Sequence, residues 1–260
     1  MCLAVVAIAA HPRFALVVAA NRDEAHARRA APAQWWNERA QDGILAGRDL
    51  SAGGTWLGVT RRGRWAFVTN VREPGRHDPG APSRGALVVD ALDDARTAET
   101  AVAAIHARAA SYNGYNLIAG DLARASWASN RVDAVHVLEA GVHGVSNARL
   151  DTPWPKLERA KAGMRAWAAM ATDDVAPLLA MLADRTQAPD DALPATGVSR
   201  EWERLLSAPF IVSERYGTRC STVLTIAHDG ASRFVERSFD ATGAAVGEVE
   251  HRFEVEKASG

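Results

Sequence analysis

The sequence predicts an α+β fold in which antiparallel sheets are covered by helices. Short apolar segments typical of β-strands occupy the first and last parts of the 260-residue chain. Segments whose apolar residues recur at helical spacing lie between them. Sheets and amphipathic helices bury their apolar faces against another layer, so this order of elements predicts sheets packed under helices.

Two hairpins are predicted in the first third of the chain. Leu3–Ala10 and Phe14–Ala20 are apolar segments separated by His11-Pro12-Arg13, where proline presets its own backbone angle for a turn. Thr55–Thr60 and Trp65–Val71 are separated by a short basic stretch with a glycine, which is a second hairpin signal.

Two longer segments are predicted to lack regular structure. Glu24–Gly53 is polar and is expected to be irregular. Arg72–Gly85 carries three prolines and is expected to be a loop. Loops of this length inside a compact domain are usually functional or mobile.

The remaining elements follow from periodicity. Thr97–Ser111, Pro155–Ala171 and Asp173–Ala183 have the spacing of helices. No internal repeat, low-complexity linker or domain boundary interrupts the chain, which predicts a single domain over residues 1–260. Further strands are expected at Asn116–Ala119, Ala125–Ala128, Ala134–Leu138, Phe210–Ser213, Ser221–Ala227, Phe234–Phe239 and Glu248–Val255.

Composition excludes several classes of function. Hydrophobic residues make up 48% of the chain and charged residues 23%, as in ordinary globular proteins. A net charge of -1 leaves no basic excess for binding nucleic acid. No apolar run approaches the roughly 18–20 residues that span a bilayer, so stable membrane insertion is not expected. The apolar start favours a hairpin over a secretion signal, and with only two cysteines a cytoplasmic, reducing location is expected.

Most catalytic and metal-binding motifs are missing from the sequence. It has no HExxH, CxxC, G-x-S-x-G or Walker pattern, and its eight histidines are scattered. We therefore expect neither a metal ion nor a bound cofactor.

The unusual feature is Cys2, which directly follows Met1. Removal of Met1 would leave a thiol and a free α-amine on one residue. The α-amine has an ordinary pKa near 7.7–8.0, so it can serve as the general base for its own nucleophile. A cysteine at position 2 on its own is more often accidental, and the other cysteine, Cys220, reads as a buried thiol.

Charged residues at the end of the next predicted strand strengthen the case for Cys2. Phe14–Ala20 runs directly into Asn21-Arg22-Asp23-Glu24. Such a tetrapeptide could be a solvated turn. Beside a nucleophile, however, Arg22 would lower the thiol pKa and Asp23 would orient the amine or the arginine.

This tetrapeptide also carries a family resemblance. It is the sequence that names the NRDE family, also called the Transport and Golgi organisation 2 family, and four further blocks of the chain match that family in the expected order. The five blocks span nearly the whole chain, so the protein is identified as a member of the family. The four further blocks are Gly54–Gly58, Thr69–Arg72, Ser146–Lys156 and Tyr216–Thr222.

The family resembles the N-terminal-nucleophile (Ntn) hydrolases, nearest to the cysteine type that includes bile-salt hydrolase and penicillin V acylase. This resemblance implies a four-layer αββα fold with two stacked antiparallel sheets. It also implies a site in which Cys2 attacks and Arg22 and Asp23 assist, although their spacing is shorter here than in those amidases. Asn70 and Asn147 would form the oxyanion hole, and Arg219 would lie near the nucleophile.

Structural alternatives remain open for several of these residues. Asn70 could cap a strand, and Asn147 could cap the helix that begins near Pro153. Trp35, Trp36 and Trp56 would line an apolar pocket or pack in the core.

Two functions are compatible with the resemblance. One is hydrolysis or transfer of an acyl group at an amide bond through Cys2, with a small-molecule amide or acyl ligand. The other is a non-catalytic carrier or chaperone for a hydrophobic ligand such as haem, an acyl-CoA or a lipid, since family members have been connected with these. Fold similarity does not decide between them, and the sequence does not indicate the oligomeric state.

Overall fold

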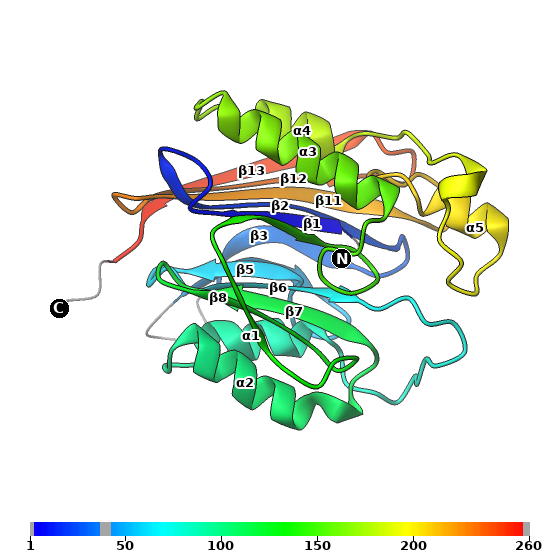
Figure 1. Cartoon of the computed structure of the whole chain (residues 1–260), viewed down its shortest axis with the longest axis horizontal. Helices are drawn as coiled ribbons and strands as arrows, with labels where there is room; N and C mark the ends of the chain where they lie inside the picture. Colours follow the sequence, from blue (N-terminus) through cyan, green and yellow to red (C-terminus); the bar gives the residue numbers. More distant parts are fainter. Residues whose placement is uncertain (1–2, 37–42, 257–260) are drawn as a thin grey trace.

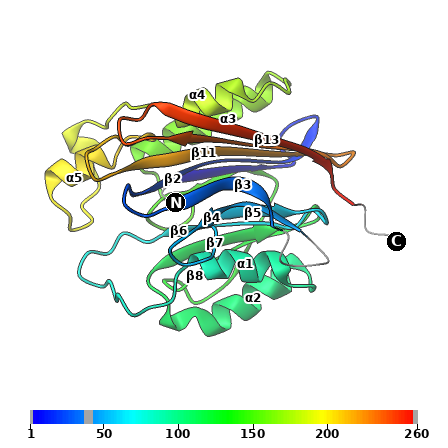
Figure 2. The same ribbon diagram turned by 180° about the vertical axis from the view of Figure 1, so that it is seen from behind.

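Two antiparallel sheets stacked face to face form the centre of the molecule (Figures 1 and 2). The computed structural model describes residues 3–36 and 43–256. The first sheet has the order β10-β1-β2-β11-β12-β13. Its strands are β1 (Leu3–Ile8), β2 (Phe14–Ala25), β10 (Gly141–Val145), β11 (Tyr216–Ala227), β12 (Ala231–Phe239) and β13 (Ala245–Glu254).

The second sheet has the order β3-β4-β5-β6-β7-β8-β9, so its neighbours in space are also neighbours along the chain. Each of its strands runs antiparallel to the next. Its strands are β3 (Ala30–Trp36), β4 (Ile44–Asp49), β5 (Leu57–Thr60), β6 (Trp65–Asn70), β7 (Tyr115–Gly120), β8 (Ala125–Ser129) and β9 (His136–Leu138).

Helices cover the outer faces of both sheets. Helices α1 (Gly85–Asp93) and α2 (Ala98–Arg108) pack on the second sheet, and α3 (Pro155–Ala169) and α4 (Ala176–Leu182) pack on the first (Figure 1). A short helix, α5 (Arg200–Leu205), lies at one end of the sandwich. The predicted four-layer αββα fold is confirmed.

Alternation along β1 shows why its residues are apolar throughout. Successive side chains of a strand point to opposite faces. Ala4 and Val6 face the layer between the sheets, whereas Leu3, Val5 and Ala7 pack against α3 and α4. Because both faces of the strand are buried, Leu3–Ile8 lacks the polar alternation of a surface strand.

The segment Glu24–Gly53, expected to be irregular, is largely regular in its described residues, 24–36 and 43–53, and that prediction was wrong. Strand β2 continues to Ala25, and the segment also contains β3 and β4. Its polar residues misled the prediction, since several of them are paired within the fold, such as Arg28 with Asp49 at 2.7 Å. In β4, Gly47 is required by packing, since a Cβ atom there would lie 2.3 Å from the Trp56 ring.

One other prediction failed, and three elements were missed. Helices α1 and α5 and strand β10 were not predicted, and Phe210–Ser213 is not a strand. Phe210 instead packs its ring against Phe239 at a centroid distance of 4.7 Å. The apolar content of that segment therefore reflects burial outside any sheet.

Candidate functional site

Five of the predicted site residues lie on strands or just after one. Arg22 and Asp23 belong to β2, Arg219 to β11 and Asn70 to β6, and Asn147 follows β10. Cys2, the predicted nucleophile, lies outside the described residues. Leu3, the next residue, pairs with Asn21 of β2, and Ala4 pairs with Val145 at the end of β10. The start of β1 is thus flanked on one side by the strand that carries Arg22 and on the other by the strand that leads to Asn147.

Arg22 is a buried cation between the two sheets. Its side chain is 4% exposed, and its guanidinium stacks over Trp56 at 4.5 Å from the ring centroid. The nearest carboxylate oxygen, on Asp49, lies 3.8 Å from Nη2, which is an ion pair without a hydrogen bond. Both Nη atoms are buried, and neither has a hydrogen-bond partner.

A cavity of about 310 Å³ opens beside Arg22. Arg22, Trp56 and Asp49 line one side of it. Residues 77–79 and 81–85, which follow β6 in the sequence, line the other side. Leaving a buried N–H group unpaired costs free energy, so unpaired donors at a cavity indicate a partner that the site takes up. Arg22 can therefore stabilise negative charge that is brought into, or develops within, this cavity.

Asp23 points to the opposite face of the sheet from Arg22. Its Oδ1 accepts a hydrogen bond of 2.7 Å from the Thr218 hydroxyl, which in turn accepts one from the Ile211 N–H. Asn21, two residues earlier and on the same face, donates to the carbonyl groups of Leu182 and Pro209. Asp23 thus belongs to the layer between the first sheet and its covering segments.

Asn70 and Asn147 are in direct contact. The Asn147 Nδ2 group donates to the Asn70 Oδ1 at 2.9 Å and to the Asn70 carbonyl at 3.2 Å. Asn70 is the last residue of β6, and Asn147 follows β10. Asn147 does not cap α3, because that helix begins at Pro155 with Trp154 as its cap residue.

Arg219 and Cys220 both neighbour the pair Arg22–Asp23. Arg219 Nη1 donates to the His26 carbonyl at 2.7 Å and so holds the chain just beyond β2. Cys220 pairs with Arg22 in the sheet and is a buried free thiol. Burial raises the pKa of the Cys220 thiol well above its usual value, and the Glu236 carboxyl adds to this rise. Such a thiol is a poor nucleophile, as its sequence context suggested.

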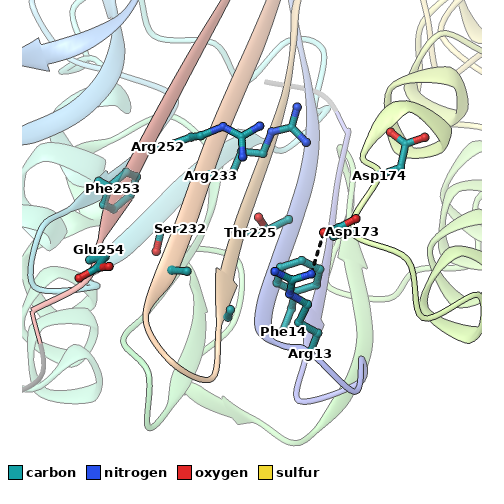
Figure 3. A pocket seen from close by; sticks show the side chains of 12 residues that line it. Arg13, Phe14, Asp173, Asp174, Thr225, Ser232, Arg233, Arg252, Phe253 and Glu254 are labelled. Atoms are coloured by element: carbon teal, nitrogen blue, oxygen red, sulfur yellow. Dashed lines mark hydrogen bonds and ion pairs between the residues drawn. The ribbon is translucent and has the colours of Figure 1, made fainter.

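A second cavity, of about 540 Å³, is lined by none of these residues (Figure 3). It lies on the part of the first sheet formed by β11, β12 and β13. Several of its charged side chains are paired, for example Arg13 with Asp173 at 2.7 Å and Arg233 with Glu250 at 2.9 Å. We find no unsatisfied buried donor there among the described residues.

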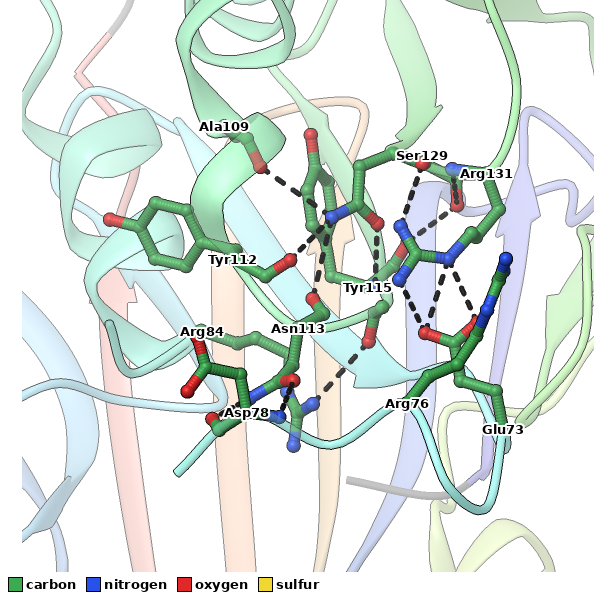
Figure 4. Close-up of polar contacts among 12 residues, drawn as sticks. Glu73, Arg76, Asp78, Arg84, Ala109, Tyr112, Asn113, Tyr115, Ser129 and Arg131 are labelled. Carbon is green, nitrogen blue, oxygen red and sulfur yellow. Dashed lines mark hydrogen bonds and ion pairs between the residues drawn. The ribbon is translucent and has the colours of Figure 1, made fainter. Parts of the chain in front are cut away.

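The loop that follows β6 is held in place by polar contacts (Figure 4). Glu73 accepts two hydrogen bonds from Arg131 Nε, at 3.1 and 2.9 Å. The Asn113 side chain accepts a hydrogen bond of 2.8 Å from the Asp78 N–H and donates one of 2.8 Å to the Asp78 carbonyl. The segment predicted as a loop is therefore a loop, with a fixed path beside the Arg22 cavity.

Two residues of the site were missed by the sequence analysis. Arg72 donates to the Asn147 Oδ1 at 3.3 Å and to the Glu203 carboxylate at 2.7 Å. Arg72 lies in one of the matching blocks, which is a signal that could have drawn attention to it. Glu203 lies in the short helix α5, and no sequence motif around it indicates a functional role.

The described residues contain no group of three or more histidine, cysteine or acidic side chains arranged to hold a metal ion. Within the same ranges, no helix is long and apolar enough to cross a membrane.

Comparison with known proteins identifies the family. The family model described as Transport and Golgi organisation 2 matches residues 1–241. The chain belongs to this family. It is 38% identical over 244 residues to the Transport and Golgi organization protein 2 homolog of Bos taurus, and 36% identical over 244 residues to that of Homo sapiens. Both matches cover 86% of this chain and 87% of the relative.

Solved structures show the same fold at low sequence identity. Penicillin V acylase from Agrobacterium tumefaciens aligns with a TM-score of 0.51 and 13% identity, over 97% of this chain and 86% of the acylase. A mutant conjugated bile acid hydrolase from Clostridium perfringens aligns with a TM-score of 0.53 and 8% identity, over 98% and 92% of the two chains. The family member described here therefore has the Ntn-hydrolase fold.

Proposed function

We propose that this protein is an Ntn-type amidohydrolase that cleaves or transfers an acyl group at an amide bond. In this proposal Met1 is removed, the Cys2 thiolate attacks the amide carbonyl, and the α-amine of Cys2 takes up the thiol proton. Collapse of the tetrahedral intermediate breaks the C–N bond, and the leaving amine receives that proton. Water, or another acceptor, then releases the acyl group from Cys2.

The observation that carries this proposal is the buried Arg22 guanidinium, whose two Nη atoms have no hydrogen-bond partner. Leu3 pairs with Asn21, the chain neighbour of Arg22, and consecutive Cα atoms are about 3.8 Å apart. Leu3 is therefore near this cation, and in this proposal Cys2, to which Leu3 is bonded, acts beside it. A neighbouring cation favours the thiolate over the thiol, which supports an activated nucleophile at position 2.

The contact between Asn70 and Asn147 supports a second element of the mechanism. Attack on an amide carbonyl concentrates negative charge on its oxygen, and fixed amide donors stabilise that charge without reorganising. We assign the donor role to the Nδ2 group of Asn70, with Asn147 holding the Asn70 amide in place. Asp23 and Arg219 act from behind the reacting groups, where they hold β2 and β11 in register through Thr218 and His26.

A turnover assay tests this proposal. Untagged protein is incubated with a panel of amides that includes penicillin V and conjugated bile acids, and release of the amine is measured. We expect turnover of at least one amide, no turnover by Cys2→Ala, and none by protein with a residue added before Cys2, because a blocked amine cannot accept the thiol proton. Equal turnover by wild type and Cys2→Ala would contradict the proposal.

A carrier of an apolar ligand is the second candidate, and one cavity favours it. This cavity, of about 370 Å³, adjoins Asn70 and Asn147 and is walled by Val198, Trp202 and Leu206. Trp202 is a large apolar side chain that is 44% exposed. Three of its seven lining residues are apolar, as an acyl chain requires, and the lining offers no histidine, cysteine or methionine for axial ligation of haem, only Tyr216. Ligand binding that is unchanged in Cys2→Ser, together with no turnover by wild type, would favour the carrier.

A further inference from the structure

Behind the two asparagines lies a buried ion pair that neither the sequence nor the family resemblance assigns to the site. Arg72 Nη1 and Glu203 Oε2 are 2.7 Å apart, and their side chains are 9% and 4% exposed. Withdrawing two charges from water is costly, and their attraction offsets this cost only when the remaining atoms are also hydrogen-bonded. Glu203 Oε1 meets this condition, since it accepts from the Thr196 N–H at 2.7 Å and from the Thr196 hydroxyl.

Arg72 fixes which way the Asn147 amide is turned. A guanidinium carries only donors, so the Asn147 atom that faces Arg72 Nη2 at 3.3 Å has to be the oxygen. The Ser146 hydroxyl donates to the same oxygen at 3.3 Å. The main chain is held as well, because the Arg72 N–H donates to the Asn147 carbonyl at 2.7 Å. The Nδ2 group of Asn147 is therefore turned away from Arg72.

Asn147 passes this orientation on to Asn70. Its Nδ2 group has donors only, so it meets the Oδ1 and the carbonyl oxygen of Asn70, at 2.9 and 3.2 Å. With Oδ1 engaged, the Nδ2 group of Asn70 is the end turned away from Asn147. Reversing either amide would set two donors or two acceptors against each other. The hydrogen bonds that link Glu203, Arg72, Asn147 and Asn70 in series therefore allow only one direction of donation, which we call the polarity of the series.

We propose that Arg72 and Glu203 are positioning residues that fix this polarity, so that Asn70 presents its Nδ2 donors to the oxyanion. The inference rests on the proposed amidohydrolase function for its catalytic consequence. A purely structural reading assigns the ion pair only to docking α5 against the loop after β6. The two readings differ for any change that keeps the ion pair but removes the hydrogen bond to Asn147.

Arg72→Lys makes that change. A lysine ammonium is a compact point charge, which retains the attraction to Glu203 but lacks a second rigid arm for the Asn147 oxygen. We expect kcat for the amide turned over by wild type to fall roughly 10- to 100-fold, with KM changed less than about twofold, because the donor is misaligned but not lost. Asn147→Asp keeps the Arg72 contact but cannot donate to Asn70, and we expect a similar fall in kcat.

Arg131→Lys is the matched control. It makes the same change in the ion pair of Arg131 with Glu73, the residue that follows Arg72 in the sequence. No hydrogen bond joins that pair to Asn70 or Asn147 among those described. We expect its kcat to stay within about twofold of wild type. Iodoacetamide alkylation of Cys2 needs no oxyanion donor, so its rate should be unchanged in Arg72→Lys. Wild-type kcat in Arg72→Lys, or an equal loss in Arg131→Lys, would overturn the proposal.

A second measurement separates this inference from the proposed function. The exchange of the side-chain amide protons of Asn147 with solvent can be followed by ¹⁵N NMR whether or not the protein turns over any amide. We expect slow exchange in wild type and in Arg131→Lys, and clearly faster exchange in Arg72→Lys, with folding verified by the backbone spectrum. Equal exchange in wild type and Arg72→Lys would show that Arg72 does not set the polarity.

Discussion

At the scale of single residues, the site is organised around one cation that lacks hydrogen-bond partners. Arg22 stacks on Trp56, and its two Nη atoms are buried without an acceptor. The ring of Trp56 is in turn seated on Gly47, where no side chain would fit. Gly47 of β4 therefore positions the Trp56 ring, and the ring in turn positions the Arg22 guanidinium.

This arrangement predicts the behaviour of Arg22→Leu. The leucine retains apolar contact with Trp56, but the positive charge is lost. We expect the pKa of the Cys2 thiol to rise toward the value of a free cysteine, so that the pH profile of iodoacetamide alkylation moves to higher pH. Arg28→Leu is the control, since Arg28 binds Asp49 at 2.7 Å in the same cavity but is about one-third exposed. An unshifted profile in Arg22→Leu would show that Arg22 does not activate the thiol.

Family resemblance predicted Arg22, Asn70 and Asn147 as site residues, but the sequence could not predict their contacts. Alternation along β2 places Arg22 and Asp23 on opposite faces of the sheet, which separates two residues expected to act together. Glu203 was not identified because its role depends on α5 lying against the loop after β6. Sequence spacing contains no information about contacts between segments so far apart.

At the scale of elements, a polar cluster fixes the loop that carries Asn147. Asp151 accepts hydrogen bonds from the Gly144 N–H of β10 at 2.9 Å and from Lys161 of α3 at 2.6 Å. His143 Nδ1 lies 3.0 Å from the other oxygen of Asp151. Burial opposes the charge on Asp151, but these hydrogen bonds outweigh it and lower its pKa from 3.8 to about 2. The same contact with Asp151 raises the pKa of His143 above 6.5.

The shifted pKa values of Asp151 and His143 make the free energy of unfolding depend on pH. Asp151 stabilises the fold above its ordinary pKa, and this contribution is lost as pH falls from about 4 through about 2. Protonated His143 stabilises the fold below its ordinary pKa, and this contribution is lost as pH rises through its raised folded pKa. Asp151→Asn should remove both contributions.

Urea unfolding across the pH range checks this prediction. The difference in unfolding free energy between wild type and Asp151→Asn should be largest between the two transitions and should shrink on either side of them. Asp90→Asn removes the exposed ion pair of Asp90 with Arg108, and we expect it to change stability little at any pH. A pH-independent difference for Asp151→Asn would show that the cluster does not titrate as described.

Elements were predictable where a regular pattern agreed with burial. The strands of both terminal hairpins and the helices α2, α3 and α4 follow from periodicity. Strands β3 and β4 and helix α1 do not, because polar or glycine-containing segments acquire their structure from partners distant in the sequence. Trp36 illustrates this dependence, since its indole donates to the Ala46 carbonyl of the neighbouring strand at 3.0 Å.

At the scale of the whole molecule, the two sheets share one apolar layer. Phe67 of β6 is fully buried in this layer, together with residues of β1, β2 and β11 from the other sheet. We expect Phe67→Ala to lower the unfolding free energy by about 3–5 kcal/mol. We also expect one cooperative unfolding transition, as for a single domain.

Calorimetry and urea unfolding measure both quantities. Val246→Ala is the control, because Val246 is 63% exposed on β13, and its effect should stay within about 0.5 kcal/mol. Two separate transitions in wild type would contradict a single domain. A negligible effect of Phe67→Ala would contradict a shared core between the sheets.

The central claim, that Cys2 is the nucleophile of an amide-cleaving enzyme, is tested most directly by intact mass spectrometry. Untagged protein is mixed with penicillin V or another amide from the panel, quenched in acid during turnover, and weighed before and after digestion. We expect a chain that lacks Met1 and carries the acyl group on the peptide that begins with Cys2. Retention of Met1, or an acyl group on any other residue, would contradict it.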